Sequence, residues 1–556
     1  MNSNRQTLKQ STMKKEIKSI IAAACLFAVL TSCSNNDINT SGNETGKGLQ
    51  FSFTEAAYDE DQELTRSCPK PTTVNLGDCE AEVSIENDPT PQTPTRSITS
   101  AHYTIRAYKD GVKKGEISGT FTGSTFVEDP TSGPGISLKQ HGVYDFVAFN
   151  DDVVSVGDEL TIAPDKAETA RIGTLTETIN QEPEQTISFE MKHVGARVKI
   201  ELSSRKHFPE PLKATVRNVD EHNASVTINY NPATKVYTKG TTTTDQSVPV
   251  TFPVSSQPLY VSSGYGDTYG FTSTNVNYIY LLPGSTDSKV RVQFTAGTHF
   301  WKTLAGTAIS NLFSPAPNGS YKVKVKMKPR YTYLFNDGTT GFLTAPENAS
   351  KKAVGIEVAP GLAVALKDIP NSMGMIWSSI SNNSNLQQYK NRFADAKQTV
   401  DGYAITWDGN QTTNPAGVVK GDDQLNFPLF YYAGHYDEAL TAEGIPITGT
   451  LVGKKWFLPS LGEWIIALKT LGFFDETALT GYSDFYDPPV APWYGNLSAY
   501  AFMQVPGGYN VPGFAATANE YDTGSVIRLR CFISGITVIE YMKQAVDYPA
   551  RAFIRY

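Results

Sequence analysis

The sequence predicts a mainly β protein in which packed β-sandwiches are followed by a unit that also contains helices. Up to about Pro329, apolar and polar residues alternate in short runs separated by Gly, Pro and Asn, which is the pattern of half-buried strands. Only 19% of the residues are charged, whereas Gly (44), Tyr (28) and Phe (27) are plentiful, as in β-rich extracellular proteins. Segments with helical periodicity occur only after residue 330.

Residues 1–33 have the features of a lipoprotein signal peptide. Met13–Lys18 carries net positive charge and Ile20–Leu30 is almost wholly apolar. This apolar run is shorter than the roughly 20 residues that a membrane-spanning helix needs. It ends at Leu30-Thr31-Ser32-Cys33, which resembles the lipobox of bacterial lipoproteins. The resemblance implies cleavage before Cys33, a diacylglycerol on its sulfur, and anchoring in the outer membrane.

Residues 34–97 are expected to form a tether, a first strand and a cleavable loop. The polar stretch 34–47 cannot bury enough apolar surface to fold. Leu49–Phe53 alternates like a strand, and residues 55–97 are rich in Pro, Thr and acids, so we expect them to be irregular. Exposed loops are where proteases cut. This stretch contains Arg66 and Arg96, each followed by a serine, and Ser97 leads directly into the next strand.

Three cysteines remain after the signal segment. Cys68 and Cys79 can pair in an oxidising compartment, which would leave Cys531 single. Cys531 lies in an alternating, strand-like run, so a small buried hydrophobe is a better interpretation than a nucleophile.

Strand-like runs divide residues 98–329 into two expected sandwiches, 98–195 and 196–329. The runs are His102–Tyr108, Gly142–Phe149, Thr186–Met191, Ala196–Leu202, Ser225–Tyr230, Asn277–Leu282, Lys289–Phe294 and Ser320–Met327.

An ordered set of segments up to residue 329 resembles the fimbrillin family of type V pilus subunits. The set comprises the lipobox, the first strand, an arginine before a "TRS" start, and the segments TIRAYKDG, GVYDFVAF, FEMKHVGARVKI and PNGSYKVKVKMKP. The resemblance implies export as a lipoprotein and two transthyretin-like β-sandwich domains. It also implies that an arginine-specific protease removes the lipidated first strand; we prefer Arg96 as the cleavage site, because Ser97 leads directly into the next strand, and Arg66 is the alternative. The groove left behind would take a donor strand from the next subunit.

Residues 330–556 are expected to form an α+β unit. Helix-like segments occur at Asn385–Lys397 and Leu461–Leu471, and Ser460 with Glu463 forms a capping box for the second. The segments KKWFLPSLGEW and ARAFIRY resemble those of C-type-lectin-like domains of bacterial surface proteins. We predict that 331–556 folds as one unit with Trp456, Leu458 and Trp464 in its core. The Glu-Pro-Asn and Trp-Asn-Asp calcium signatures of true C-type lectins are absent from the sequence, so we expect no calcium-dependent sugar binding.

The sequence contains no motif that selects a catalytic or metal site. The seven histidines are scattered, without zinc-ligand spacing. Phosphate-binding Gly-rich loops and nucleophile elbows are also missing. The net charge of −8 excludes an electrostatic footprint for nucleic acid. We therefore expect no cofactor, no metal and no enzyme, and a glycosidase whose carboxylates come from distant parts of the chain is a distant alternative.

Aromatic residues are dense between Tyr482 and Phe514. Aromatic faces interleaved with amides and carboxylates suit sugar stacking or protein contact. The alternative, which we favour for any one aromatic, is a long loop folded on its own small core. The candidate contact residues are Trp493, Tyr494, Tyr486, Asp487 and Asn496.

The sequence is interpreted as a pilus tip subunit that receives a donor strand but gives none. Its expected partners are other pilus subunits, host or bacterial glycans or proteins, and the membrane through the lipid anchor. Residues 553–556 match a closing strand and 326–329 run straight into another domain, so neither segment is expected to serve as a donor. The alternative is a surface glycan-binding lipoprotein that never polymerises.

Overall fold

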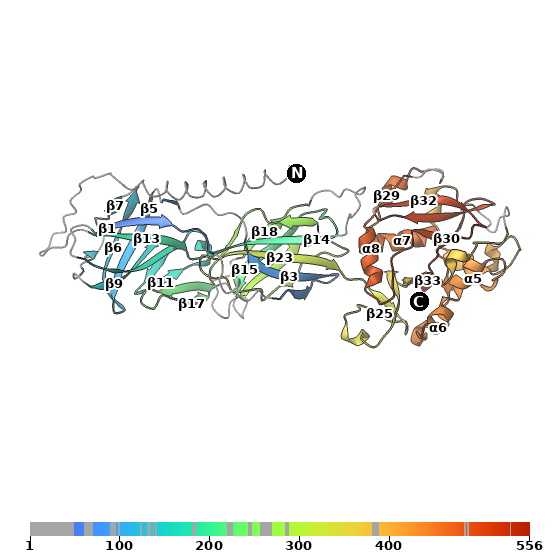
Figure 1. Ribbon diagram of the computed structural model, residues 1–556, viewed down its shortest axis with the longest axis horizontal. Helices are drawn as coiled ribbons and strands as arrows, with labels where there is room; N and C mark the ends of the chain where they lie inside the picture. The colour runs from blue at the N-terminus through green and yellow to red at the C-terminus, as the bar shows by residue number, and fades with distance from the viewer. Residues whose placement is uncertain are drawn as a thin grey trace, which may run out of the picture.

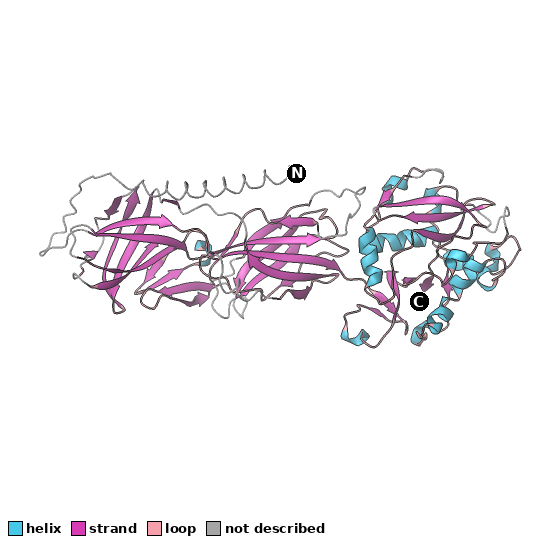
Figure 2. Ribbon diagram, in the orientation of Figure 1, coloured by secondary structure: helices cyan, strands magenta, loops and turns pink. Residues whose placement is uncertain are grey.

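The computed structural model describes residues 49–59, 70–88, 96–97, 100–122, 125–130, 135–136, 138, 142–180, 185–219, 226–242, 247–255, 270–283, 289–380, 389–482, 485, 489–533 and 535–556. Three units follow one another in a row: a first sandwich, a second sandwich and a C-terminal unit (Figure 1). The α-helices of the described residues lie in the C-terminal unit (Figure 2). None of the helices in these ranges is long and apolar enough to cross a bilayer.

The first sandwich packs a nine-stranded sheet, in the order β4-β1-β13-β12-β9-β5-β6-β7 with β8 on β6, against the four-stranded sheet β10-β11-β16-β17. Successive residues of β9 point to opposite faces, so Phe146 enters one core and Val147 the other. The strands of the first sandwich are β1 (Leu49–Glu55), β4 (Arg96–Ser97), β5 (Ser100–Lys109), β6 (Val112–Thr122), β7 (Thr125–Glu128), β8 (Gly135–Ile136), β9 (Val143–Asn150), β10 (Val154–Val156), β11 (Glu159–Ile162), β12 (Arg171–Thr178), β13 (Gln185–His193), β16 (Val226–Asn231) and β17 (Val236–Thr242).

The second sandwich packs the sheet β19-β14-β23-β3-β2, with β20 on β14, against β18-β15-β21-β22. One apolar core, which includes Ile200, Val216, Val292 and Val323, joins the two sheets. The strands of the second sandwich are β2 (Thr72–Asn75), β3 (Cys79–Asn87), β14 (Ala196–Ser204), β15 (Leu212–Val219), β18 (Val248–Phe252), β19 (Phe271–Thr274), β20 (Ile279–Leu281), β21 (Lys289–Ala296), β22 (Ala308–Ile309) and β23 (Ser320–Pro329).

The two sandwiches are not contiguous in sequence, contrary to the expected boundary between residues 195 and 196. The β16–β17 hairpin pairs with β11 of the first sandwich, where Tyr230 lies opposite Leu160. Conversely, β2 and β3 belong to the second sandwich although they precede the first sandwich's β5. Strand alternation predicts that a segment is a strand, but it does not predict which sheet the strand joins.

The stretch 55–97, which was expected to be irregular, therefore contains an inner strand. Nine residue pairs join β3 to β23 antiparallel, from Asn87 opposite Tyr321 to Cys79 opposite Pro329. Inward Ala81 and Val83 of β3 are buried, and outward Glu82 forms ion pairs with Lys326 and Lys328 of β23 at 3.4 and 2.6 Å. Because glutamate is unfavourable in strands, the segment resembles a loop until its lysine-rich partner strand is known.

The pairing of Cys79 with Cys68 that the sequence allows is not formed in this structure. Cys79 is free and fully buried at the start of β3, and burial raises the pKa of its thiol well above the usual value. Cys68 lies outside the described residues. Cys531 is also a free thiol; it is partly buried and packs against the core of the C-terminal unit, in keeping with a small hydrophobe.

The C-terminal unit combines the sheets β25-β24-β26-β27-β33-β28 and β29-β32-β31-β30 with short helices. Trp456, Leu458 and Trp464 are all buried in its cores, as expected. Its elements are β24 (Tyr333–Phe335), β25 (Thr340–Gly341), β26 (Ala353–Ala359), β27 (Leu362–Ala365), α3 (Phe393–Ala396), α4 (Gly402–Trp407), α5 (Pro428–Gly434), α6 (Tyr436–Ala442), β28 (Trp456–Phe457), α7 (Leu461–Gly472), β29 (Ala491–Pro492), α8 (Gly495–Met503), β30 (Phe514–Glu520), β31 (Ser525–Cys531), β32 (Gly535–Met542) and β33 (Phe553–Arg555).

One of the two expected helices is confirmed and the other is reduced to a single turn. Helix α7 begins after Ser460, and the capping box between Ser460 and Glu463 is present. Of the helix expected at 385–397, residues up to 388 lie outside the described residues, and only α3 is helical in the rest. Apolar spacing over so short a segment does not determine helix length.

An aromatic joint connects the second sandwich to the C-terminal unit. Trp301 of the second sandwich stacks on Phe473 at the end of α7, with ring centroids 5.3 Å apart. Tyr331, two residues after β23, donates its hydroxyl to the carbonyl oxygens of Leu471 and Leu497 at 2.9 and 3.1 Å. The chain therefore passes from one unit into the core of the next with almost no linker.

Candidate functional site

Strand β1 lies in an aromatic groove of the first sandwich. It pairs parallel with β13 over seven residues, from Leu49 opposite Gln185 to Glu55 opposite Met191. Its inward side chains, Phe51 and Phe53, are buried. Burying two such rings stabilises the strand by about 1.5–3 kcal/mol each.

The rings that contact these two phenylalanines come from four other strands. Phe53 stacks on Tyr103 of β5 and on Phe189 of β13, with centroids 4.4 and 5.4 Å apart. It also meets Phe121 of β6 edge-on at 5.1 Å, and Phe51 meets Phe126 of β7 edge-on at 5.6 Å. The long sheet therefore curls so that β6 and β7 approach β1 from the side opposite β13. If β1 left, an apolar groove between these strands would be open.

Strand pairing at the outer edge of β1 is confined to its end in the part of the chain that the structure describes. Within the described residues, β4 pairs with β1 at two positions, Thr54 opposite Ser97 and Glu55 opposite Arg96. Strand β1 is therefore paired along its whole length with one neighbour, β13, and a sheet edge of this kind can pair with another extended segment when β1 leaves.

A cluster of ionisable side chains surrounds the end of β1. The Arg171 guanidinium binds the Glu55 carboxylate through Nε at 2.9 Å and Nη2 at 2.8 Å. His193 Nε2 lies 3.5 Å from the same carboxylate oxygen. Burial, followed by the neighbouring Arg171 charge, lowers the pKa of His193 to about 4, so this ring is neutral at pH 7. Sequence reasoning missed this cluster because 116 residues separate Glu55 from Arg171.

The anchoring and cleavage residues predicted from sequence lie mostly outside the described residues. Cys33 and Arg66 are among these. The backbone of Arg96 forms part of β4. Strands β2 and β3 lie between Arg66 and Arg96, so the two candidate cuts would release different amounts of structure.

The two predicted contact aromatics that the structure describes, Trp493 and Tyr494, are both buried. Trp493 is 1% exposed and its Nε1 donates to the carbonyl oxygen of Phe532 at 2.6 Å. Tyr494 is 2% exposed and its hydroxyl is hydrogen-bonded to the ring of His207 in the second sandwich, so it belongs to the aromatic joint. Asn496 is partly exposed in the first turn of α8. The other two predicted contacts, Tyr486 and Asp487, lie outside the described residues.

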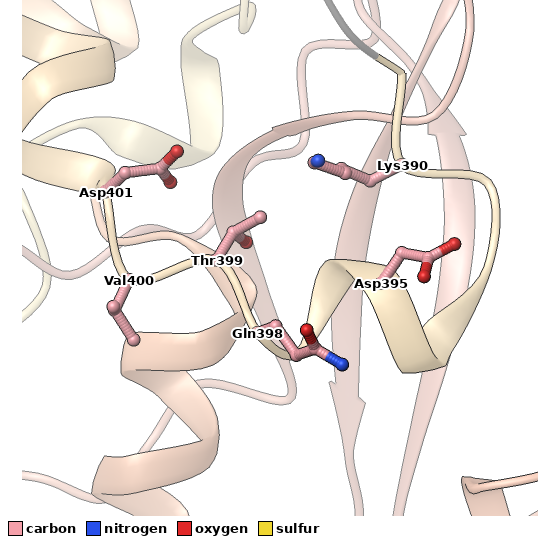
Figure 3. A pocket seen from close by; sticks show the side chains of 6 residues that line it. All are labelled: Lys390, Asp395, Gln398, Thr399, Val400 and Asp401. Atoms are coloured by element: carbon pink, nitrogen blue, oxygen red, sulfur yellow. The ribbon is translucent and has the colours of Figure 1, made fainter.

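A polar pocket of about 440 Å³ lies in the C-terminal unit beside α3 and α4. The side chains of Lys390 and Asp401 extend toward one another across it (Figure 3). Burial raises the pKa of Asp401, and the Lys390 charge partly offsets this. The pocket combines donors and acceptors that suit a hydroxylated ligand. Its lining residues are Lys390, Asp395, Gln398, Thr399, Val400 and Asp401.

Sequence reasoning did not predict this pocket, because its residues lie in the single-turn helix α3 and the loops beside it and form no recognised motif. Among the described residues, no group of three or more His, Cys, Asp or Glu side chains is arranged to hold a metal ion.

Comparisons with known proteins give weak structural similarity. No protein-family model matches the sequence, and no curated protein matches it. A fimbrial protein from Bacteroides ovatus is 11% identical, with a TM-score of 0.27 over 92% of this chain and 100% of that one. The fimbrial anchor protein Mfa2 from Porphyromonas gingivalis is 11% identical, with a TM-score of 0.19 over 44% of this chain and 77% of that one. Similarity at this level does not support a conclusion about function.

Proposed function

We propose that this chain is an adhesive subunit of a cell-surface pilus, and that its first sandwich binds an extended strand from a neighbouring subunit after β1 is removed. The observation that carries the proposal is the way β1 is held. Strand β1 pairs parallel with β13, and its two inward rings pack against aromatic side chains of other strands. An incoming strand with alternating apolar residues can make the same contacts.

Arg66 is the better candidate for the maturation cut, in place of Arg96. A cut after Arg66 releases β1 and leaves β2 and β3 in the second sandwich. A cut after Arg96 also detaches β3, which β23 holds through nine residue pairs. Only the first cut opens the groove of the first sandwich without damaging the second.

N-terminal sequencing of pilus-associated protein tests this proposal. We expect mature chains to begin at Ser67, and an Arg66→Ala variant to stay lipid-anchored with β1 in place. Arg96→Ala is the matched control and should mature normally. Mature chains that begin at Ser97 would show that the site is wrong. Chains that always begin at Cys33 would instead favour the alternative, a surface glycan-binding lipoprotein that does not polymerise.

We further propose that the subunit lies at the pilus tip. Strand β33 is an inner strand that pairs with β27 on one side and β28 on the other, so neither of its edges is free for a partner's sheet. Strand β23 is likewise paired on both sides and continues directly into the C-terminal unit. Neither segment can serve as a donor without unfolding its own sheet.

Immunogold labelling of pili should place this protein at tips, with little label along shafts. If neither β23 nor β33 is donated and no other segment is, the subunit accepts a strand without giving one and can occupy only one end of a fibre. The C-terminal unit, with its polar pocket, would then face outward as the adhesive part. Regular labelling along the shaft would contradict the tip position, as would a cross-link between residues 550–556 and another subunit's groove.

A further inference from the structure

The five residues at the end of β1 and just after it bind to the boundary between the two sandwiches. Ala56 N donates to Met191 O at 2.9 Å in the first sandwich. Asn318, just before β23 of the second sandwich, donates its amide nitrogen to Ala57 O at 2.8 Å. Lys192 pairs with Asp59 at 3.0 Å. The groove therefore continues beyond the two phenylalanines into a polar section.

Arg171 is oriented toward this section independently of Glu55. Its Nη1 donates to the carbonyl oxygens of Glu168 and Ala170 at 2.7 and 3.2 Å, and its backbone nitrogen donates to Asn150 Oδ1 at 2.9 Å. These contacts lie outside β1 and remain when β1 leaves. Both N–H groups of the Nε and Nη2 edge converge on one carboxylate oxygen, Glu55 Oε1, and the same edge is directed into the groove when β1 leaves.

The side chains that pack against the Tyr58 ring form a second recognition element. The ring stacks on His193 with centroids 4.0 Å apart, and the Arg197 guanidinium lies 4.7 Å from its centroid. Asn318 Oδ1 accepts from His193 Nδ1 at 3.0 Å, which holds the imidazole in place. The Tyr58 hydroxyl is buried without a hydrogen-bond partner among the described residues, so His193 and Arg197 recognise the ring and not the hydroxyl.

We propose that this polar section makes the groove selective for strands that carry an acidic residue after the apolar pair. The preferred partner segment has two apolar residues two positions apart, an acid two positions later and an aromatic three positions after the acid. Arg171 binds the acid, and His193 with Arg197 binds the aromatic ring. This inference rests on the proposed strand-accepting function and adds the chemistry of the partner.

Strand exchange in the full chain tests the proposal. A site for a sequence-specific protease replaces residues 61–66, and the purified chain is cut there without being truncated. Fluorescent peptides with the sequence of residues 49–59, LQFSFTEAAYD, then compete for the groove. We expect the Glu55→Gln peptide to bind about tenfold more weakly than the unchanged peptide, because its amide oxygen can accept the same two hydrogen bonds but lacks the negative charge that strengthens them. Tyr58→Ala should also weaken binding, whereas Tyr58→Phe, the matched control, should not.

A variant of the chain isolates the contact. In Arg171→Met, the unchanged and Glu55→Gln peptides should bind equally, and Arg171→Lys should restore only part of the difference. Equal binding of the two peptides to the unchanged chain would overturn the proposed selectivity for an acidic residue. It would leave the proposal that the groove accepts a strand unchanged. Failure of every peptide, including the unchanged one, to exchange would instead overturn the proposed strand-accepting function.

Discussion

A chain that begins at Ser97 is expected to lose its second sandwich, whereas a chain that begins at Ser67 is expected to keep it. The shorter chain lacks β3, whose nine pairs with β23 lie inside the sheet β19-β14-β23-β3-β2. It also lacks the buried side chains of Leu76, Cys79 and Val83. The free energy of unfolding of a whole domain is only about 5–15 kcal/mol, so the loss of an inner strand exceeds what the sandwich can tolerate.

Calorimetry and hydrogen exchange of the two truncated chains measure this difference. The amides of β14 and β23 should be protected in the chain from Ser67 and exposed in the chain from Ser97. A Val83→Asp change in the full chain provides an independent check, because it buries a charge in the same core without shortening the chain. Cooperative melting of an intact second sandwich in the chain from Ser97 would remove the argument for Arg66.

Replacement of Trp464 by alanine is expected to unfold the C-terminal unit and to leave both sandwiches folded. The side chain is fully buried, its Nε1 donates to Ala516 O at 3.0 Å, and its ring meets Phe553 edge-on at 5.0 Å. Removal of a buried Trp costs about 3–5 kcal/mol, a large part of the stability of one domain. Because Trp464 links α7 to β30 and β33, its loss affects helix and sheets together.

Calorimetry together with hydrogen exchange of the three units checks this prediction, since the first sandwich contains no tryptophan to report its folding by fluorescence. Trp464→Phe should cost less, because the ring remains and mainly the hydrogen bond is lost. Leu425→Ala serves as the control, since this side chain is 82% exposed and its removal should leave the melting temperature unchanged. Unchanged melting of the C-terminal unit in Trp464→Ala would contradict its assignment to the core.

The parts of the fold that depend on neighbouring residues were predictable from sequence. Ser460 and Glu463 define the start of α7 by themselves, and the cluster around Trp456 and Trp464 is apolar enough to require burial. The alternation of β23 was equally clear. In each case the pattern lies within about ten residues.

The parts that depend on distant residues were not predictable. The glutamates of β3 favour a strand only once β23 supplies lysines opposite them. Tyr494 has the surroundings of a loop aromatic, and only the position of His207 shows that it joins two units instead of facing a ligand. The clamp of Arg171 on Glu55 required the sheet to bring β12 near the end of β1. Such pairings are properties of topology, which a single sequence does not display.

The parallel pairing of β14 and β23 determines how the protein resists pulling. Strand β14 begins at the boundary with the first sandwich, and β23 ends where the chain enters the C-terminal unit. When a bound surface pulls on the C-terminal unit and the fibre holds the first sandwich, the two strands are drawn past each other along their length. All eight of their residue pairs then share the force at once, instead of opening one after another. In the proposed arrangement, the second sandwich would therefore carry tension in shear along β14 and β23, and it should unfold only at a higher force than a sheet whose strands are opened pair by pair.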